Sequence, residues 1–207
     1  MSILVVYATR HGATAGIAER LAAALRRAGL EAEARPVTEV GDIARYDTFV
    51  VGSAAYMTHW LKEATSFVKR HQATLAAHPL WLFSSGPIGT DLVDKQGRDV
   101  VEASRPREFA EFEALLHPRG ERVFFGAWDP RAPGRSLGER LLRMMPAKVL
   151  DEMPAGDFRD WAAIDAWGLE IADALGVSTT SARQAGPDPR DVDDQPSRSL
   201  SSPNAAP

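Results

Sequence analysis

The sequence predicts a doubly wound α/β fold, in which a five-stranded parallel sheet carries helices on both faces. Short apolar runs of strand length alternate along the chain with segments whose apolar residues recur at helical spacing. Three of the apolar runs lead into loops rich in Ser, Thr, Gly or aromatic residues. Ligands of such sheets bind beyond the carboxyl ends of the strands. We therefore expect one ligand site at that edge of the sheet.

The first two elements show both patterns clearly. Residues 3–8 are apolar almost throughout, as in a parallel strand that is covered on both faces. Residues 13–28 form the first expected helix, because apolar side chains recur every three or four positions and Gly29 follows as a good helix stop. Residues 30–36 alternate apolar with charged residues, which predicts a second strand near the edge of the sheet.

The middle of the chain repeats the alternation. Residues 42–46 are expected to form a short helix or turn, and residues 48–52 a third strand that is apolar on both faces. Residues 60–77 are predicted to form one long helix with an apolar inner stripe. Residues 80–83 are the fourth expected strand. A polar loop is expected over residues 90–105.

The last third contains a helix over 106–116, a fifth strand over 122–128 and a final helix over 160–175. Residues 131–156 are expected to be an insertion before that last helix, which Asp157 is expected to cap. From residue 176 on, almost no large apolar residue occurs. We therefore expect one domain over 1–175 and a disordered tail over 176–207.

Composition excludes several classes of function. The net charge of −4 argues against a nucleic-acid-binding protein, which is usually basic. The chain has no cysteine, so disulfides, thiolate nucleophiles and cysteine-ligated clusters are excluded and redox chemistry would need an organic cofactor or another kind of metal site. The five histidines show no metal-binding spacing, and we expect no metal. Neither a secretory signal nor a membrane span is visible, which predicts a cytoplasmic protein.

The first loop is the expected phosphate site. It follows the first strand and leads directly into a helix, whose N-terminal N–H groups and dipole favour an anion. The loop lacks both the G-x-G-x-x-G of dinucleotide sites and the G-K-[ST] of triphosphate sites. Hydroxyls and a single glycine suit a compact terminal phosphate such as that of FMN. Alternatively, Thr9 and Thr14 are only helix-capping residues and His11 is an exposed turn residue.

The second and third loops would hold the rest of such a ligand. Tyr56 and Trp60 follow the third strand, and aromatic rings stack well on a flat isoalloxazine. Trp60 is equally compatible with the interior of a helix. The loop over 84–89 offers backbone groups to the polar edge of a ring, although Pro87 lacks an N–H donor. Alternatively, it is an ordinary turn at the end of a strand.

The chain resembles the flavodoxin superfamily in its first loop, where Thr9-Arg10-His11-Gly12-Ala13-Thr14 follows a strand. Within the superfamily, the T-R-x-G-x-T form and the run from Gly52 to His71 resemble the branch that includes menaquinone-dependent protoporphyrinogen oxidases of bacteria. The resemblance covers roughly residues 1–175 and implies FMN as cofactor and the strand order 2-1-3-4-5. It implies these cofactor-binding residues: Thr9, Arg10, His11, Gly12, Ala13, Thr14, Ser53, Ala54, Ala55, Tyr56, Ser84, Ser85, Gly86, Pro87, Ile88 and Gly89.

The same resemblance implies an FMN-dependent oxidoreductase that oxidises protoporphyrinogen IX, a reaction of haem biosynthesis, and passes electrons to a quinone. Because the flavin carries the chemistry, no catalytic acid or base is expected. The alternative is a flavodoxin-type electron carrier without its own substrate, whose partner would be a redox protein. A carrier would be expected to have a strongly acidic face, against which the mild net charge argues. A flavodoxin-like fold without cofactor is a third interpretation.

A basic amphipathic segment over residues 135–150 raises the question of membrane contact. Leu137 and Leu141 can share one face, while Arg140 and Arg143 lie on another. Such a segment can lie on an anionic bilayer, where a quinone would be reached. The simpler interpretation, which we favour, is a helix packed over the edge of the sheet. The localisation expected is therefore cytoplasmic, with peripheral contact at the inner face of the membrane as a second hypothesis.

Overall fold

The computed structural model describes residues 1–128 and 155–177. Its centre is a parallel sheet in the order β2-β1-β3-β5-β6. These strands are β1 (Ser2–Ala8), β2 (Glu31–Pro36), β3 (Thr48–Tyr56), β5 (Leu80–Ser85) and β6 (Gly120–Phe124). Counted along the chain, the five parallel strands have the order 2-1-3-4-5, so the predicted topology is confirmed. The second strand lies at the edge, as its alternating sequence indicated.

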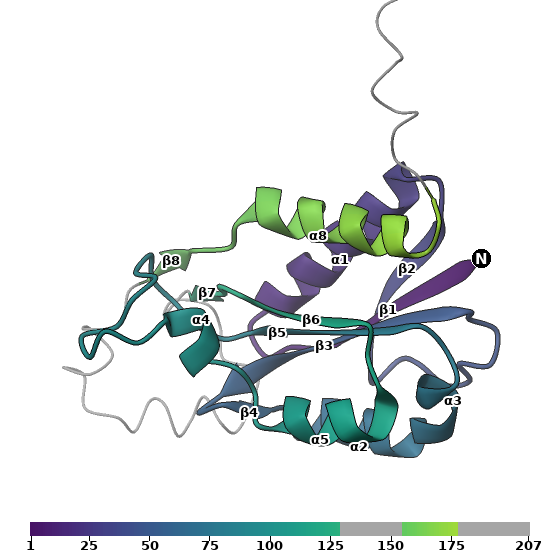
Figure 1. Ribbon diagram of the computed structural model, residues 1–207, viewed down its shortest axis with the longest axis horizontal. Coiled ribbons are helices and arrows are strands. Elements are labelled where there is room, and N and C mark those ends of the chain that lie inside the picture. The colour runs from purple at the N-terminus through teal and green to yellow at the C-terminus, as the bar shows by residue number, and fades with distance from the viewer. Residues whose placement is uncertain (129–154, 178–207) are drawn as a thin grey trace, which may run out of the picture.

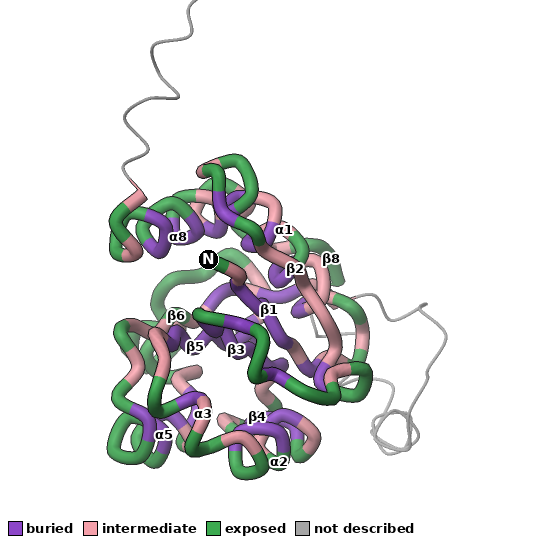
Figure 2. Tube along the Cα trace, turned by 90° about the vertical axis from the view of Figure 1, so that its right-hand side faces the viewer, coloured by how far each residue is buried: buried purple, intermediate pink, exposed green. Residues whose placement is uncertain are grey.

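Helices cover both faces of the sheet (Figure 1). On one face lie α1 (Ala13–Arg27) and α8 (Trp161–Ala174), and on the other α2 (Lys62–Arg70), α3 (Gln72–Ala76) and α5 (Glu108–Leu116). Two apolar clusters fill the space between the layers, one on each side of the sheet. Figure 2 shows the buried residues gathered on the central strands and on the inward sides of the helices. The sheet is therefore rigid and apolar on both faces, which leaves its edges to bind ligands.

The prediction of one helix over 60–77 is wrong at two points: Trp60 lies in a strand, and the remainder is divided into two helices. His59 and Trp60 form a short strand, β4 (His59–Trp60), that pairs antiparallel with the end of β3. The Glu108 carboxylate accepts a hydrogen bond from the Trp60 N–H at 3.1 Å and also contacts the His59 ring. This tertiary contact holds the hairpin against the local helical pattern. The helix itself breaks at His71, between α2 and α3.

The predicted fifth strand over 122–128 is also divided. After β6, a second short strand, β7 (Ala127–Trp128), leaves the sheet and pairs antiparallel with β8 (Gly156–Asp157). The prediction that Asp157 caps the last helix is wrong. Asp160 accepts a hydrogen bond from Ala163 N–H at 2.9 Å and is the N-cap of α8. Asp157 instead binds the guanidinium of Arg159.

The third strand is longer than predicted, and the long polar loop contains a short helix. The expected strand over 48–52 continues to Tyr56 as β3, so Gly52 lies within the strand rather than at its end. The loop over 90–105 contains one short helix, α4 (Val100–Ala103), whose N-cap Asp99 accepts a bond from Glu102 N–H.

Several expectations fall outside the part of the chain that the structure describes. They are the insertion up to residue 154, the amphipathic segment over 135–150 and the tail from residue 178 on. Among the residues described, no helix has the length and apolar character that crossing a membrane would require.

Candidate functional site

An open cavity of about 250 Å³ lies at the carboxyl edge of the sheet, where β1, β3 and β5 end. The three loops predicted to share one site do meet there. The cavity is lined by Thr9, His11, Ala13, Thr14, Ala54, Ala55, Tyr56, Met57, Ser85, Gly86, Ile88, Gly126, Ala127 and Trp128. Ten of the sixteen residues predicted from the sequence are in this set, and they come from all three loops.

The first loop turns sharply from β1 into α1. Gly12 is the N-cap of α1 and has a φ of 85°, a left-handed conformation that glycine adopts without steric cost. The Thr9 hydroxyl accepts a hydrogen bond from Gly12 N–H at 3.0 Å, which closes the turn. Gly12 offers no side-chain acceptor to the first turn of α1. The helix N-terminus at the cavity therefore has the uncapped N–H groups and the dipole that suit an anion.

The first and third loops are joined by a buried pair of hydroxyls. Thr14 Oγ1 lies 2.8 Å from Ser85 Oγ, and both residues are buried. The alternative that Thr14 is only a helix-capping residue therefore does not hold, because its hydroxyl bonds across the cavity edge instead of to the helix. Gly86, the next residue of the third loop, lies next to Ala55. A Cβ added at Gly86 would lie 3.4 Å from the Ala55 carbonyl oxygen.

The second loop supplies the aromatic rim of the cavity. Tyr56 lies at the end of β3 and is 39% exposed, while Met57 beside it is 93% exposed. Met57 and Thr58 both have positive φ, at 51° and 64°, and form the two-residue turn of the β3–β4 hairpin. Trp60 is not part of the rim. It is buried against Phe109 and Phe112, but it lies in β4 and not in a helix, so the alternative of an interior helix residue is right about its burial and wrong about its secondary structure.

Six of the predicted site residues lie outside the cavity lining: Arg10, Gly12, Ser53, Ser84, Pro87 and Gly89. Two of them have clear structural roles. Ser53 is buried, donates to Ala54 O and accepts from Leu61 N–H, which fixes the start of α2 against β3. Ser84 is also buried and donates to Ser53 O, which ties β5 to β3.

Arg10 extends away from the loop toward α2. Its guanidinium forms an ion pair with Glu63 at 3.1 Å, and both side chains are more than a third exposed. The arginine of the first loop is thus already paired.

The structure adds four lining residues that the sequence did not reveal as site residues: Met57, Gly126, Ala127 and Trp128. The last three follow β6 and form a fourth wall. Trp128 packs edge-on against the ring of His11, with the ring centroids 5.1 Å apart. The only signal in the sequence that β6 ends before this wall is Gly126, which directly follows two phenylalanines.

The electrostatics of the cavity come from dipoles and hydrogen-bond donors. Among the described lining residues none is Asp, Glu, Lys or Arg, and only His11 can carry a charge. The nearby carboxyl of Asp157 has a pKa below its ordinary range, because it accepts hydrogen bonds from Arg159. No pair of groups suited to general acid–base catalysis lines the described part of the cavity.

Fold and site together define a doubly wound α/β protein whose ligand lies beyond the carboxyl ends of the strands. The chain belongs to the flavodoxin domain family, whose model matches residues 4–132. FMN is the cofactor of this family, which places the chain among FMN-type oxidoreductases and electron-transfer proteins.

Two solved structures are similar to this chain in fold. A flavodoxin from the domain Archaea superposes with a TM-score of 0.51 at 15% identity, over 85% of this chain and 99% of that one. The rubredoxin oxygen:oxidoreductase of Desulfovibrio gigas superposes with the same TM-score at 12% identity, over 89% of this chain and 37% of that one. At these identities the similarity shows the fold alone.

A partial relative is more specific. The protoporphyrinogen IX dehydrogenase [quinone] of Escherichia coli K12 is 30% identical over 86 residues, which cover 41% of this chain and 48% of that protein. The chain thus spans about half the length of the curated relatives it matches.

The residues of the cavity fit FMN. The uncapped N-terminus of α1 and the hydroxyl of Thr9 suit its phosphate. Tyr56, Ala54 and Ala55 offer an apolar side to its ring.

Proposed function

We propose that the cavity holds FMN with its phosphate in the loop from Thr9 to Thr14 and its ring between Tyr56 and the loop from Ser85 to Ile88. The observation that carries this proposal is the convergence of three loops, distant in sequence, on one cavity beside an uncapped helix N-terminus. The glycine turn at Gly12 lets the phosphate approach the backbone N–H groups without a Cβ in the way.

We further propose that the protein oxidises a porphyrinogen and passes the electrons to a quinone. The partial similarity to the Escherichia coli dehydrogenase supports this substrate and acceptor. When bound, FMN supplies the redox chemistry at its ring. The protein's own residues bind the phosphate, orient the ring and leave its exposed edge open beside Tyr56 and Met57.

A large apolar reaction partner would need exposed apolar side chains at the rim of the cavity. Met57 is almost fully exposed and lies beside the half-exposed Tyr56, so an apolar molecule can reach the cavity mouth without displacing the sheet. No acid or base is assigned, because the described lining contains no carboxylate and no lysine or arginine.

The deciding experiment is an anaerobic assay of the FMN-loaded protein with protoporphyrinogen and a menaquinone. Conversion that requires both the protein and the quinone supports the enzyme. If the loaded protein is reduced and reoxidised by redox proteins but leaves the porphyrinogen unchanged, the substrate is wrong and the protein is an electron carrier. A Met57→Asp variant should slow turnover more than it weakens FMN binding, because it places a charge at the apolar rim and not at the phosphate loop.

A further inference from the structure

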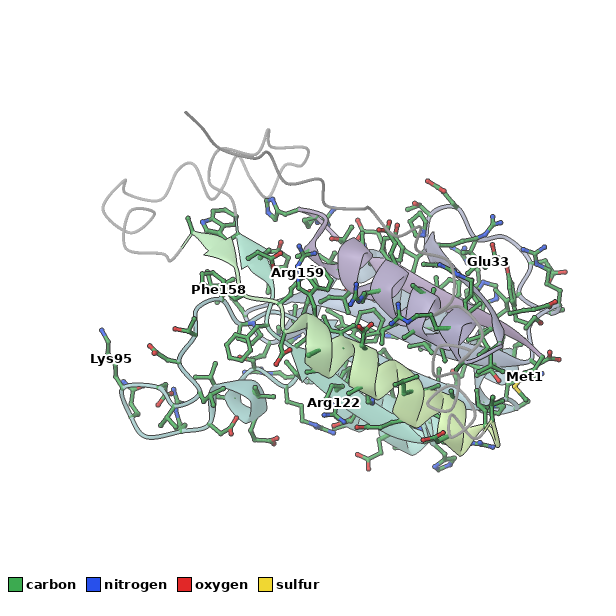
Figure 3. The ribbon with its side chains drawn as sticks, turned by 90° about the horizontal axis from the view of Figure 1, so that it is seen from above. Met1, Glu33, Lys95, Arg122, Phe158 and Arg159 are labelled. Carbon is green, nitrogen blue, oxygen red and sulfur yellow. The ribbon has the colours of Figure 1, made fainter. Side chains whose placement is uncertain are left out.

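The segment between β8 and α8 contacts the first loop of the chain through one side chain, that of Arg159. Arg159 Nη1 donates a hydrogen bond to Ala13 O at 3.2 Å, across 146 positions of sequence. The Arg159 side chain is only 16% exposed. In Figure 3 it lies between β8 and the N-terminal end of α1.

The guanidinium is held on several sides. Its Nε and Nη2 donate to the two oxygens of Asp157 at 2.7 and 2.6 Å, and it lies over the Trp161 ring at 4.3 Å. The Asp157 carboxylate also neutralises the charge of the guanidinium. Arg159 therefore acts on the first loop through its fixed position and hydrogen bond rather than as a free positive charge.

Gly16 provides the space for this contact. A Cβ at Gly16 would lie 2.4 Å from Arg159 Nη1. Glycine inside a helix costs roughly 0.5–1 kcal/mol relative to alanine. Its presence in the first turn of α1 is explained by the guanidinium that occupies the place of its side chain.

The β7–β8 ribbon makes a second contact with the same loop. β7 contributes Trp128, whose ring packs against that of His11, and β8 contributes Asp157, which orients Arg159. Both strands of one small ribbon thus support the loop from Thr9 to Thr14, one at its middle and one at its junction with α1.

We propose that Arg159 is a positioning residue that holds the N-terminus of α1 in the geometry needed to bind a phosphate, and so makes the site select a phosphorylated flavin over an unphosphorylated one. This inference rests on the proposed FMN site. Arg159 is not one of the residues that line the cavity; it acts through its hydrogen bond to Ala13, which is one of them.

The test compares the affinities of FMN and riboflavin, which differ by the phosphate, in the full chain. The variants are Arg159→Gln, which keeps a polar side chain but loses the reach and the ion pair, and Gly16→Ala, which displaces the guanidinium. Arg122→Gln is the matched control, because Arg122 is likewise an arginine paired with an acidic residue, Glu170 of α8 at 3.0 Å, but lies on β6. Both test variants should lose about tenfold in FMN affinity, or about 1.4 kcal/mol, with riboflavin affinity within about twofold of the unaltered protein. The control should change neither.

Alanine favours the helix by about 1 kcal/mol over glycine, so a loss of FMN affinity in Gly16→Ala cannot come from a less stable helix. This variant therefore separates positioning from stability. The proposal is overturned if both variants keep full FMN affinity, or if FMN and riboflavin weaken equally.

A second readout needs no flavin. In the flavin-free protein, amide hydrogen exchange at residues 12–16 should be faster in Arg159→Gln than in the unaltered protein. Unchanged exchange there would also overturn the proposal. If exchange is faster in Arg159→Gln but the unaltered protein binds no flavin, Arg159 still supports the loop. The FMN site is then refuted instead.

Discussion

Thr14 Oγ1 and Ser85 Oγ lie 2.8 Å apart and join the first and third loops at the edge of the cavity. Both residues are buried, so each hydroxyl depends on the other for a partner. The bond fixes the distance between the expected phosphate end of the site and one edge of the expected ring position. It makes two loops that lie 71 positions apart in sequence into one rigid wall.

The first prediction concerns this bond. Thr14→Val removes one hydroxyl at nearly constant volume and leaves that of Ser85 buried and unpaired, which should cost about 1–3 kcal/mol of unfolding free energy. The double variant Thr14→Val with Ser85→Ala should cost less than the sum of the two single changes, by about 1 kcal/mol. Urea unfolding of the flavin-free protein measures all four members of the cycle. Strict additivity would show that the two hydroxyls do not depend on each other.

The second prediction concerns Gly52 in β3. A Cβ there would lie 2.0 Å from the ring of Phe83, its neighbour on β5. The ring is fully buried and has little room to move, so Gly52→Ala should destabilise the protein by roughly 1–3 kcal/mol. Gly41→Ala is the control, because a Cβ at Gly41 would meet nothing within 4 Å. Chemical unfolding that gives the two variants equal stability would contradict this account of the packing.

The third prediction concerns the docking of α8 on α1. Asp165 accepts hydrogen bonds from Arg20 at 2.7 Å and from Arg27 at 2.6 Å, and its pKa lies below its ordinary value chiefly because of the bond from Arg20. A lowered pKa in the folded state contributes stability that is present above the unfolded pKa, near 4, and is lost as the pH falls through the folded value.

Asp165→Asn should therefore cost about 1 kcal/mol of unfolding free energy near pH 7, the upper end for partly exposed ion pairs. The cost should begin to shrink as the pH falls below about 4 and should vanish only below the lowered folded pKa of Asp165, where the unaltered carboxyl is protonated as well. Glu170→Gln, on the same helix but in the more exposed pair with Arg122, should show a smaller effect. A cost that stays constant from pH 7 to pH 3 would show that charge at Asp165 is not involved.

The sequence predicted those parts of the fold that local pattern determines. The apolar run of β1 and the helical stripe of α1 are periodic over their whole length, and both were found within one residue of the expected bounds. Gly52 misled the prediction of β3, because a glycine that makes room for a ring looks the same in sequence as one that ends a strand.

Short elements held by distant contacts could not be predicted. β4 exists because Glu108, 48 positions away, binds the Trp60 N–H, and nothing near Trp60 signals this. The same applies to the site. The loops that follow strands could be located from sequence, but the fourth wall at Trp128 and the support from Arg159 depend on a ribbon of two-residue strands.

The central claim is that the cavity binds FMN by its phosphate, and equilibrium titration of the flavin-free protein with FMN and with riboflavin tests it most directly. The account predicts one FMN bound per chain, with quenched flavin fluorescence, and clearly weaker binding of riboflavin. Thr9→Val should reduce this preference for FMN, because the Thr9 hydroxyl closes the phosphate turn through Gly12 N–H. Absence of FMN binding, or equal affinity for the two flavins, would contradict the account.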